Sequence, residues 1–200
     1  MRAAAFGIAF AALCAAGEAA AAGVFGVWVP SARASAAEPL PLRAGTSAAE
    51  TGADAACPPG MPALLETTEP IEIVERGDRV LMRFAQWGVE RVVYLEPRNG
   101  PPSGQRSPLG ASFGRWERGG TLAIFTLYID YPFFDAHGTP QSKNVTVLER
   151  YTPSADGQRL DYRVTVTDEA TFTRPVVREG SMTFDPAATT AGLVATGCVG

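Results

Sequence analysis

The residues best suited to chemistry cluster in the segment from Tyr128 to Ser142, "YIDYPFFDAHGTPQS". It holds Asp130, Asp135 and His137, the only histidine of the chain. An imidazole beside a carboxylate can act as a general base, because the carboxylate selects the tautomer of the ring. The same residues also fit a structural role, in which Asp135 caps a turn and His137 stays in solvent. We favour the structural role, because spacing alone does not establish catalytic geometry.

Glu149 is a fourth candidate acid or base, in the run "NVTVLERYT". If strand alternation turns Glu149 inward with Val147 and Tyr151, its carboxylate is buried and needs a partner such as Arg115 or Arg150. Such a buried carboxylate would mark a site. If Glu149 faces outward instead, it forms an exposed ion pair across strands, which contributes little to stability.

Aromatic side chains suggest a second kind of site, an apolar cavity with a few hydroxyl donors. The candidate lining residues are Trp116, Tyr128, Tyr131, Phe133, Phe134 and Tyr151. Ordinary core filling explains the same residues equally well. Proline cannot donate to a β-ladder, so we expect the chain to leave its strand at Asp130 and turn at Pro132. The following phenylalanines should then fold back, at least one of them being buried.

The elements that position these residues are β-strands. After residue 57 the sequence consists of short runs rich in Val, Ile, Thr, Phe and Tyr, separated by Gly, Pro and Asp. No stretch keeps a helical period for long. We therefore predict a mainly β domain with strands near 71–75, 79–87, 90–96, 111–117, 121–130, 144–152, 159–168 and 176–184. One antiparallel meander would form a curled sheet or a lipocalin-like up-and-down barrel, with a β-sandwich as the alternative.

The N-terminus reads as a secretory signal. Arg2 precedes an Ala-rich apolar run, and "ASA" at 34–36 offers small residues for cleavage near Ala36. The organisation predicted from this is a signal peptide over 1–36, a flexible leader over 37–56 and a single β domain over 57–200. The mature protein would be periplasmic or secreted, with no stable membrane span after cleavage.

Two cysteines remain after the predicted cleavage, which removes Cys14. Cys57 and Cys198 flank the β domain, and a disulfide between them is the economical expectation in an oxidising compartment. Two cysteines and one histidine fall short of a zinc set, so we predict no metal and no cofactor. The formal net charge of -4, spread without long runs, argues against nucleic acid as a partner.

Three stretches carry a resemblance to a known family: "GRWERGGTLAIFT" (114–126), "HGTPQSKNVTVLERYT" (137–152) and "LDYRVTVTDEATFTRPV" (160–176). In order and spacing they resemble a large family of uncharacterised secreted bacterial proteins. The resemblance covers about Leu109 to Val176 and implies a secreted β domain. It departs from the residues that members of this family usually carry at Gly120, at Gln141 and Lys143, and at Glu169-Ala170.

Three functions are compatible with the sequence. The first is a secreted β module that binds a small apolar or amphipathic ligand. The second is an acid/base enzyme, a hydrolase or isomerase, that uses Asp130, Asp135, His137 or Glu149. The third is an interaction module whose exposed sheet edge pairs with a protein partner that the sequence does not identify.

Overall fold

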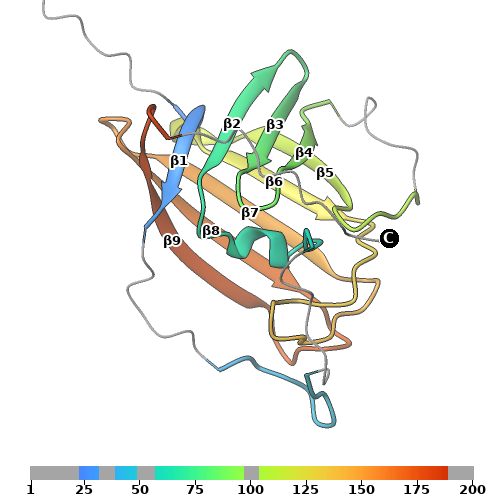
Figure 1. Cartoon of the computed structure of the whole chain (residues 1–200). Coiled ribbons are helices and arrows are strands. Elements are labelled where there is room, and N and C mark those ends of the chain that lie inside the picture. Colours follow the sequence, from blue (N-terminus) through green and yellow to red (C-terminus); the bar gives the residue numbers. More distant parts are fainter. Residues whose placement is uncertain (1–22, 32–38, 49–56, 97–103, 189–200) are drawn as a thin grey trace, which may run out of the picture.

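A computed structural model describes residues 23–31, 39–48, 57–96 and 104–188 of the chain. Nine strands within these residues close into one barrel (Figure 1). They are β1 (Gly26–Pro30), β2 (Ile71–Arg76), β3 (Arg79–Phe84), β4 (Val89–Tyr94), β5 (Ala111–Trp116), β6 (Leu122–Leu127), β7 (Thr146–Pro153), β8 (Arg159–Thr167) and β9 (Val176–Phe184). Two short 3-10 helices, η1 (Ala63–Glu66) and η3 (Arg118–Gly120), accompany them.

Each strand pairs with the next along the chain, and β9 pairs with β1 to close the ring. All these junctions are antiparallel except the one between β4 and β5, which is parallel. In a closed ring of nine strands, the direction cannot alternate at every junction, because nine is an odd number. At least one neighbouring pair must therefore be parallel. This junction is short, with only Val93 opposite Ser112 and Tyr94 opposite Phe113. The predicted up-and-down barrel is confirmed, and ring closure rules out the sandwich.

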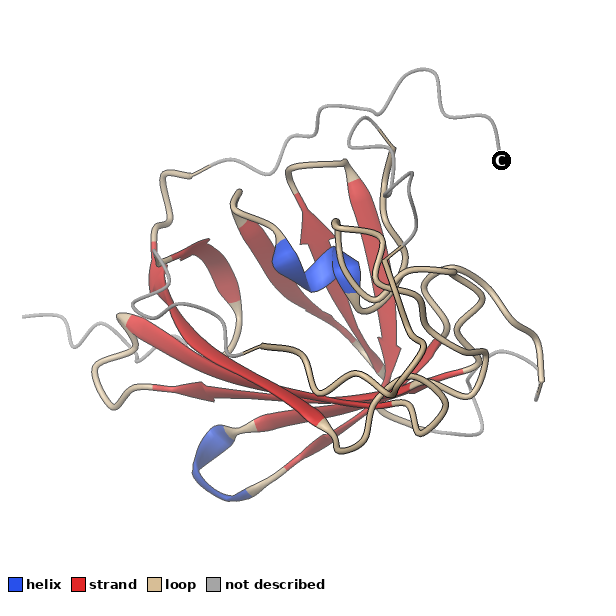
Figure 2. Ribbon diagram, turned by 90° about the horizontal axis from the view of Figure 1, so that it is seen from below, coloured by secondary structure: helices blue, strands red, loops and turns tan. Residues whose placement is uncertain are grey.

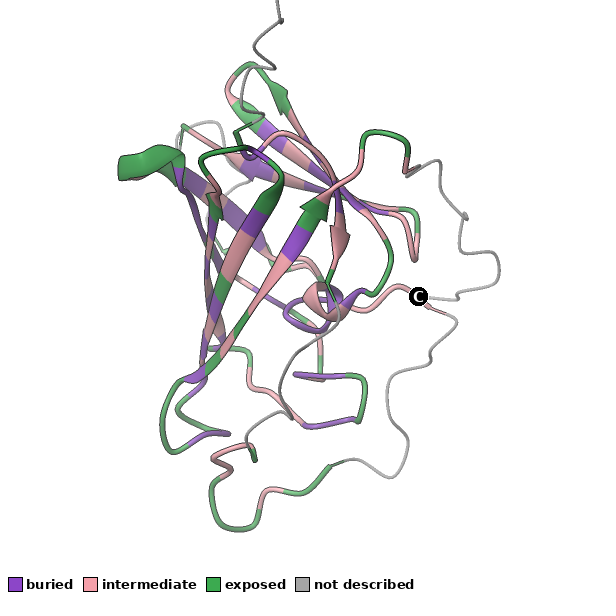
Figure 3. Cartoon of the chain, turned by 90° about the vertical axis from the view of Figure 1, so that its left-hand side faces the viewer, coloured by how far each residue is buried: buried purple, intermediate pink, exposed green. Residues whose placement is uncertain are grey.

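Strand alternation sets the inner face of the barrel. In β8, Leu160, Val164 and Val166 are buried while Arg163 is exposed, as the alternation of "RLDYRVTVT" predicts. Buried and more exposed residues follow one another along the strands (Figure 3). The sequence of β6 is apolar on both faces, which predicts a strand that is covered on both sides or lines a cavity, but Phe125 on its outer side is 43% exposed. β6 also ends at Leu127, because Tyr128 takes a left-handed φ of 59° that breaks the extended run.

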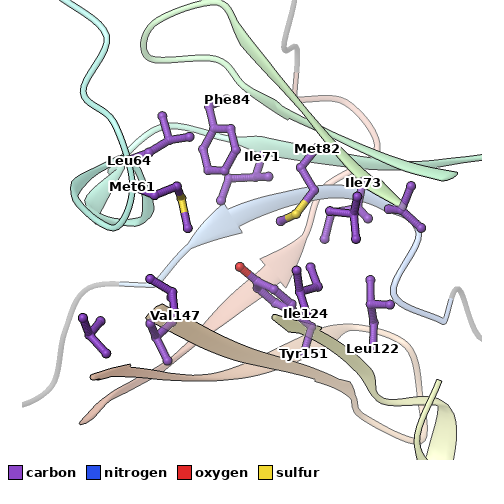
Figure 4. Close-up of a cluster of buried hydrophobic side chains, with 14 of the residues drawn as sticks. Met61, Leu64, Ile71, Ile73, Met82, Phe84, Leu122, Ile124, Val147 and Tyr151 are labelled. Carbon is purple, nitrogen blue, oxygen red and sulfur yellow. The ribbon is translucent and has the colours of Figure 1, made fainter. Parts of the chain in front are cut away.

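The inward side chains form one continuous core (Figure 4). It draws Ile73 and Met82 from β2 and β3, and Ile124 and Val147 from β6 and β7, so opposite walls of the barrel meet at the centre. The short helix η1 lies between the walls, where its Leu64 is fully buried (Figure 2). η1 therefore plugs the barrel from one side.

The structure differs from the sequence prediction in the N-terminal region. β1 lies inside the predicted signal peptide, yet its Trp28 is fully buried and it pairs with both β2 and β9. Part of the predicted flexible leader also packs on the domain. The backbone N–H of Arg43 donates to the carbonyl of Thr171, and that of Thr173 donates to the carbonyl of Pro41. The folded unit therefore starts well before residue 57.

Other predictions fall partly outside the described residues. Cys57 is half-buried ahead of η1, whereas Cys198 lies outside those residues, so the Cys57–Cys198 disulfide stays a prediction. In the part of the chain that the structure describes, no helix has the length and apolar character needed to cross a membrane.

Candidate functional site

An ion pair lies inside the barrel. Arg91 of β4 donates from both terminal nitrogens to Glu149 of β7, with Nη2 to Oε1 at 2.7 Å and Nη1 to Oε2 at 2.9 Å. The two side chains are 1% and 0% exposed. Burial of two charges is costly, so this pair requires its bidentate geometry and further hydrogen bonds.

Three hydroxyl groups complete this buried polar cluster of Arg91, Glu149, Ser112, Thr126 and Tyr151. Arg91 donates from Nε to the Ser112 hydroxyl at 3.0 Å and from Nη2 to the Thr126 hydroxyl at 2.7 Å. The Tyr151 hydroxyl donates to Oε2 of Glu149 at 2.9 Å. Each charged group thus has several partners, and the cluster has the features of a satisfied structural network.

The environment of the cluster keeps Arg91 and Tyr151 protonated, because the pKa of each is raised. Burial alone would lower the pKa of Arg91, but the Glu149 carboxylate raises it above its usual value. Burial and the nearby Glu149 charge raise the pKa of Tyr151 well above 10. A phenol with such a raised pKa stays protonated and serves as a hydrogen-bond donor rather than as a base.

The inward orientation of Glu149 was one of the two alternatives in the sequence, but its expected partners were wrong. Arg115 and Arg150 both bind Glu117 on the outer surface. The true partner, Arg91, was missed. Its signal was present, because "VERVVY" alternates so that Arg91 and Val93 share the buried face of β4.

The segment 128–142 adopts the corner that the sequence favoured. Phe134 is buried, and the Asp135 carboxylate accepts hydrogen bonds from the backbone N–H of His137 and of Thr139, both at 3.0 Å. The Thr139 hydroxyl donates to the same carboxylate at 2.8 Å. Gly138 takes a φ of +80°, and the His137 side chain is exposed. Asp135 therefore caps this turn.

The side chains of the four acid/base candidates do not come together in one site. The exposed carboxylate of Asp130 pairs with Lys143 at 3.1 Å, and Asp135 is occupied by its turn. Glu149 lies inside the barrel with Arg91, and His137 meets Asp135 through its backbone N–H. No catalytic pair of imidazole and carboxylate emerges among these described contacts.

Asp168, at the end of β8, organises a second turn. Its carboxylate accepts from the Ser142 N–H at 2.6 Å, the Ser142 hydroxyl at 2.7 Å and the Thr171 hydroxyl at 2.9 Å. Burial would raise the pKa of Asp168, but these hydrogen bonds hold it below the usual value. The carboxylate thereby fastens the segment 128–142 to the end of β8.

The six aromatic candidates occupy different environments. Tyr151 lies in the core with its hydroxyl directed inward (Figure 4), and Phe134 packs on Phe172 with ring centroids 4.9 Å apart. The other four are at least partly exposed: Tyr128, Tyr131, Phe133 and Trp116. Trp116 is 45% exposed beside the β5–β6 hairpin, at the other end of these strands from the segment 128–142. The six residues therefore do not line one common cavity.

A pocket at one mouth of the barrel is the strongest site candidate. It opens between η1, the segment 128–142 and the inner face of β8 and β9, and its volume is about 20 Å³. Its lining is mostly apolar and comprises Pro62, Leu65, Glu66, Phe134, Tyr162, Val164, Val166 and Arg178. We call it the mouth pocket.

The mouth pocket has one polar side. Glu66 of η1 forms an ion pair with Arg178 of β9, and the Arg178 guanidinium lies 4.6 Å from the ring centroid of Phe134. Arg178 stands opposite Val164 in the β8–β9 ladder, which places its side chain on the inner face. None of these polar residues was predicted as a site residue, because Glu66 and Arg178 are distant in sequence.

Comparisons with other proteins give no family for this chain: no family model, curated protein or solved structure matches it. Within the described ranges, no three His, Cys, Asp or Glu side chains gather in a way that could hold a metal ion. The geometry of the mouth pocket is therefore the main indication of a function.

Proposed function

We propose that this protein is a β-barrel binding module that takes a small amphipathic molecule at the mouth pocket. The observation that supports this most is the combination of an apolar lining with one inward-facing Arg–Glu pair. Ligand sites typically combine apolar walls with a few placed polar groups. The acid/base enzyme receives less support, because its four candidate residues do not converge on one site.

The apolar wall would hold the nonpolar part of the ligand. Val164 and Val166 project from β8, Leu65 comes from η1, and Phe134 comes from the segment 128–142. Removing apolar ligand surface from water at such a wall contributes about 25 cal/mol per Å². The elements that carry the wall come from three distant parts of the chain.

The Arg178 guanidinium would bind an anionic end of the ligand. In the present state the Glu66 carboxylate occupies it, and the other oxygen of Glu66 accepts from the Ala136 N–H at 3.5 Å. A ligand carboxylate, sulfonate or phosphate would replace Glu66 on Arg178 with similar charge-assisted hydrogen bonds. The ligand and Glu66 therefore compete for one cation.

The size of the mouth pocket requires a movement. A volume of about 20 Å³ accommodates a water molecule but no larger ligand. Glu66 is the residue to move, since it ends η1 and closes the pocket through its pair with Arg178, whereas Leu64 of η1 stays buried in the core. Displacement of Glu66 by the ligand would release that contact and widen the pocket.

A fluorescent probe with an apolar ring system and a sulfonate, 1-anilinonaphthalene-8-sulfonate, tests this function. We expect a saturable rise in its fluorescence on folded protein. Arg178→Gln should raise its Kd about tenfold, the effect of losing one charge-assisted hydrogen bond. Glu66→Gln should lower its Kd, because the competing carboxylate is gone. The neutral probe N-phenyl-1-naphthylamine should respond little to Arg178→Gln.

The outer surface of the same two strands offers a matched control. Arg163 of β8 pairs with Glu179 of β9 on the exposed side. Arg163→Gln and Glu179→Gln alter an equivalent ion pair without touching the mouth pocket, so neither should change the Kd of either probe. Equal responses of the two pairs, or no saturable binding by a cooperatively folded protein, would refute the proposal.

We also propose that the protein works outside the cytoplasm. The Arg2 start with its Ala-rich apolar run and the resemblance to secreted bacterial proteins support this location. Fractionation of a Gram-negative host that expresses the full chain should find the product in the periplasm or medium. Recovery in the cytoplasm alone would contradict the location and leave the ligand proposal to its own test.

A further inference from the structure

We infer that the leader peptide is cut upstream of Val24, next to Ala22, so that the mature chain keeps β1. The more obvious small-residue site, "ASA" at 34–36, lies after β1. A cut there would remove a strand of the barrel. This inference concerns processing and is independent of the ligand.

Two sheet edges depend on β1. Its residues Gly26 to Trp28 pair with β2, and Trp28 to Pro30 pair with β9. Loss of β1 would expose the backbone of both neighbours, and unpaired edges recruit other chains. β2 and β9 are each antiparallel to β1, so they run parallel to one another. They could not rejoin by the antiparallel ladder that β1 makes with each.

The core also depends on β1. Trp28 is fully buried, and its indole N–H donates to the carbonyl of Val24 at 2.9 Å. Its ring packs edge-on against Phe184 of β9 with centroids 5.4 Å apart. Val24 is itself buried. The mature chain therefore needs its residues from Val24 onward, because the hydrogen bond and the packing start there.

Gly26 shows how closely β1 fits. It has a φ of +136°, and a Cβ there would lie 2.6 Å from the Phe184 ring. A side chain at this position would both strain the backbone and collide with that ring. The sequence around β1 therefore meets a tight packing requirement, which a discarded leader would not need.

The position of the small residues agrees with the earlier cut. In secretory signals a small-residue site follows an apolar region of about 7–15 residues. The small residues "AAAA" at 19–22 follow the Ala-rich apolar run closely, whereas Trp28 and Pro30 would stand between that run and a site at Ala36.

Intact-mass analysis under denaturing conditions tests the inference on the full chain exported from a Gram-negative host. We expect a single mature species that starts at Gly23 or within two residues upstream of it. A species that starts at Ala37 or Glu38 would overturn the inference, whether or not a peptide containing β1 co-purifies. An exported chain that remains uncut would overturn it too.

Two sets of substitutions locate the cut independently. Replacing Ala19 to Ala22 with glutamine removes the small residues at the earlier site, and the precursor mass should then persist. The matched control, Ala34→Gln with Ala36→Gln, removes the small residues at the later site. This variant should still lose residues 1–22, so that its mature mass differs from that of the parent only by the two substitutions. The opposite pattern would show that the cut follows β1.

Discussion

The buried Arg91–Glu149 pair offers the sharpest test of how this barrel is held together. We consider Glu149→Gln, which keeps the shape of the side chain and removes its charge. The carboxylate accepts three hydrogen bonds, two from Arg91 and one from the Tyr151 hydroxyl. A glutamine amide would turn an NH₂ group toward one of these donors and leave the Arg91 charge unbalanced.

The expected cost follows from this geometry. Removing one partner of a fully buried ion pair destabilises a protein by about 3–5 kcal/mol, because the remaining charge has no counterpart. Ser112 and Thr126 reduce that cost only partly, since neutral hydroxyls accept hydrogen bonds from Arg91 without neutralising it. A domain typically has about 5–15 kcal/mol of total stability, so this loss would be a substantial part of the total.

The double variant Arg91→Met with Glu149→Leu removes both charges and keeps apolar volume. Such replacements of buried pairs are often neutral or stabilising, but this one leaves the buried Tyr151 hydroxyl without its acceptor, so its stability should lie between those of Glu149→Gln and the parent. Urea unfolding followed by tryptophan fluorescence and circular dichroism measures both variants, together with the single variants Arg91→Met and Glu149→Leu that complete a double-mutant cycle. The coupling energy from the full cycle should be at least about 3 kcal/mol. Additive effects, or a loss below about 1 kcal/mol for Glu149→Gln, would refute the reasoning.

Three further predictions concern stability. Cys57→Ser should lower the free energy of unfolding by about 2–5 kcal/mol under non-reducing conditions, and two free thiols in the mature protein would contradict the disulfide. Asp168 has a lowered pKa in the fold, so its contribution is present above the unfolded pKa of about 3.9 and is lost as pH falls through the folded value. Asp168→Asn should therefore reduce stability at pH 7 and flatten its decline in acid titrations. Tyr151 has a raised pKa, so its contribution is present below the unfolded pKa of about 10 and is lost as pH rises through the folded value. Tyr151→Phe should therefore lessen alkaline unfolding in a pH titration followed by circular dichroism.

Local pattern was sufficient to predict the strands from β2 to β9. Alternation in β8 and the turn residues around Gly77 and Gly157 are properties of neighbouring residues, because side chains in a strand switch faces at every position. The corner at 128–142 was predictable for the same reason. The cap, in which Asp135 accepts from the His137 N–H, spans only two residues, whereas the strand ends at Leu127 and not at Asp130 as the proline predicted.

The sequence by itself thus determined a β domain with most of its strands, its turns and the burial of at least one of Phe133 and Phe134. Tertiary structure alone decided that β1 closes the ring, because the short run Gly26–Pro30 becomes a strand only between β2 and β9. It also decided the partner of Glu149 and the meeting of Glu66 with Arg178, residues 58 and 112 positions apart in the chain. Such contacts depend on the register around the whole barrel, and that register is a property of nine strands together.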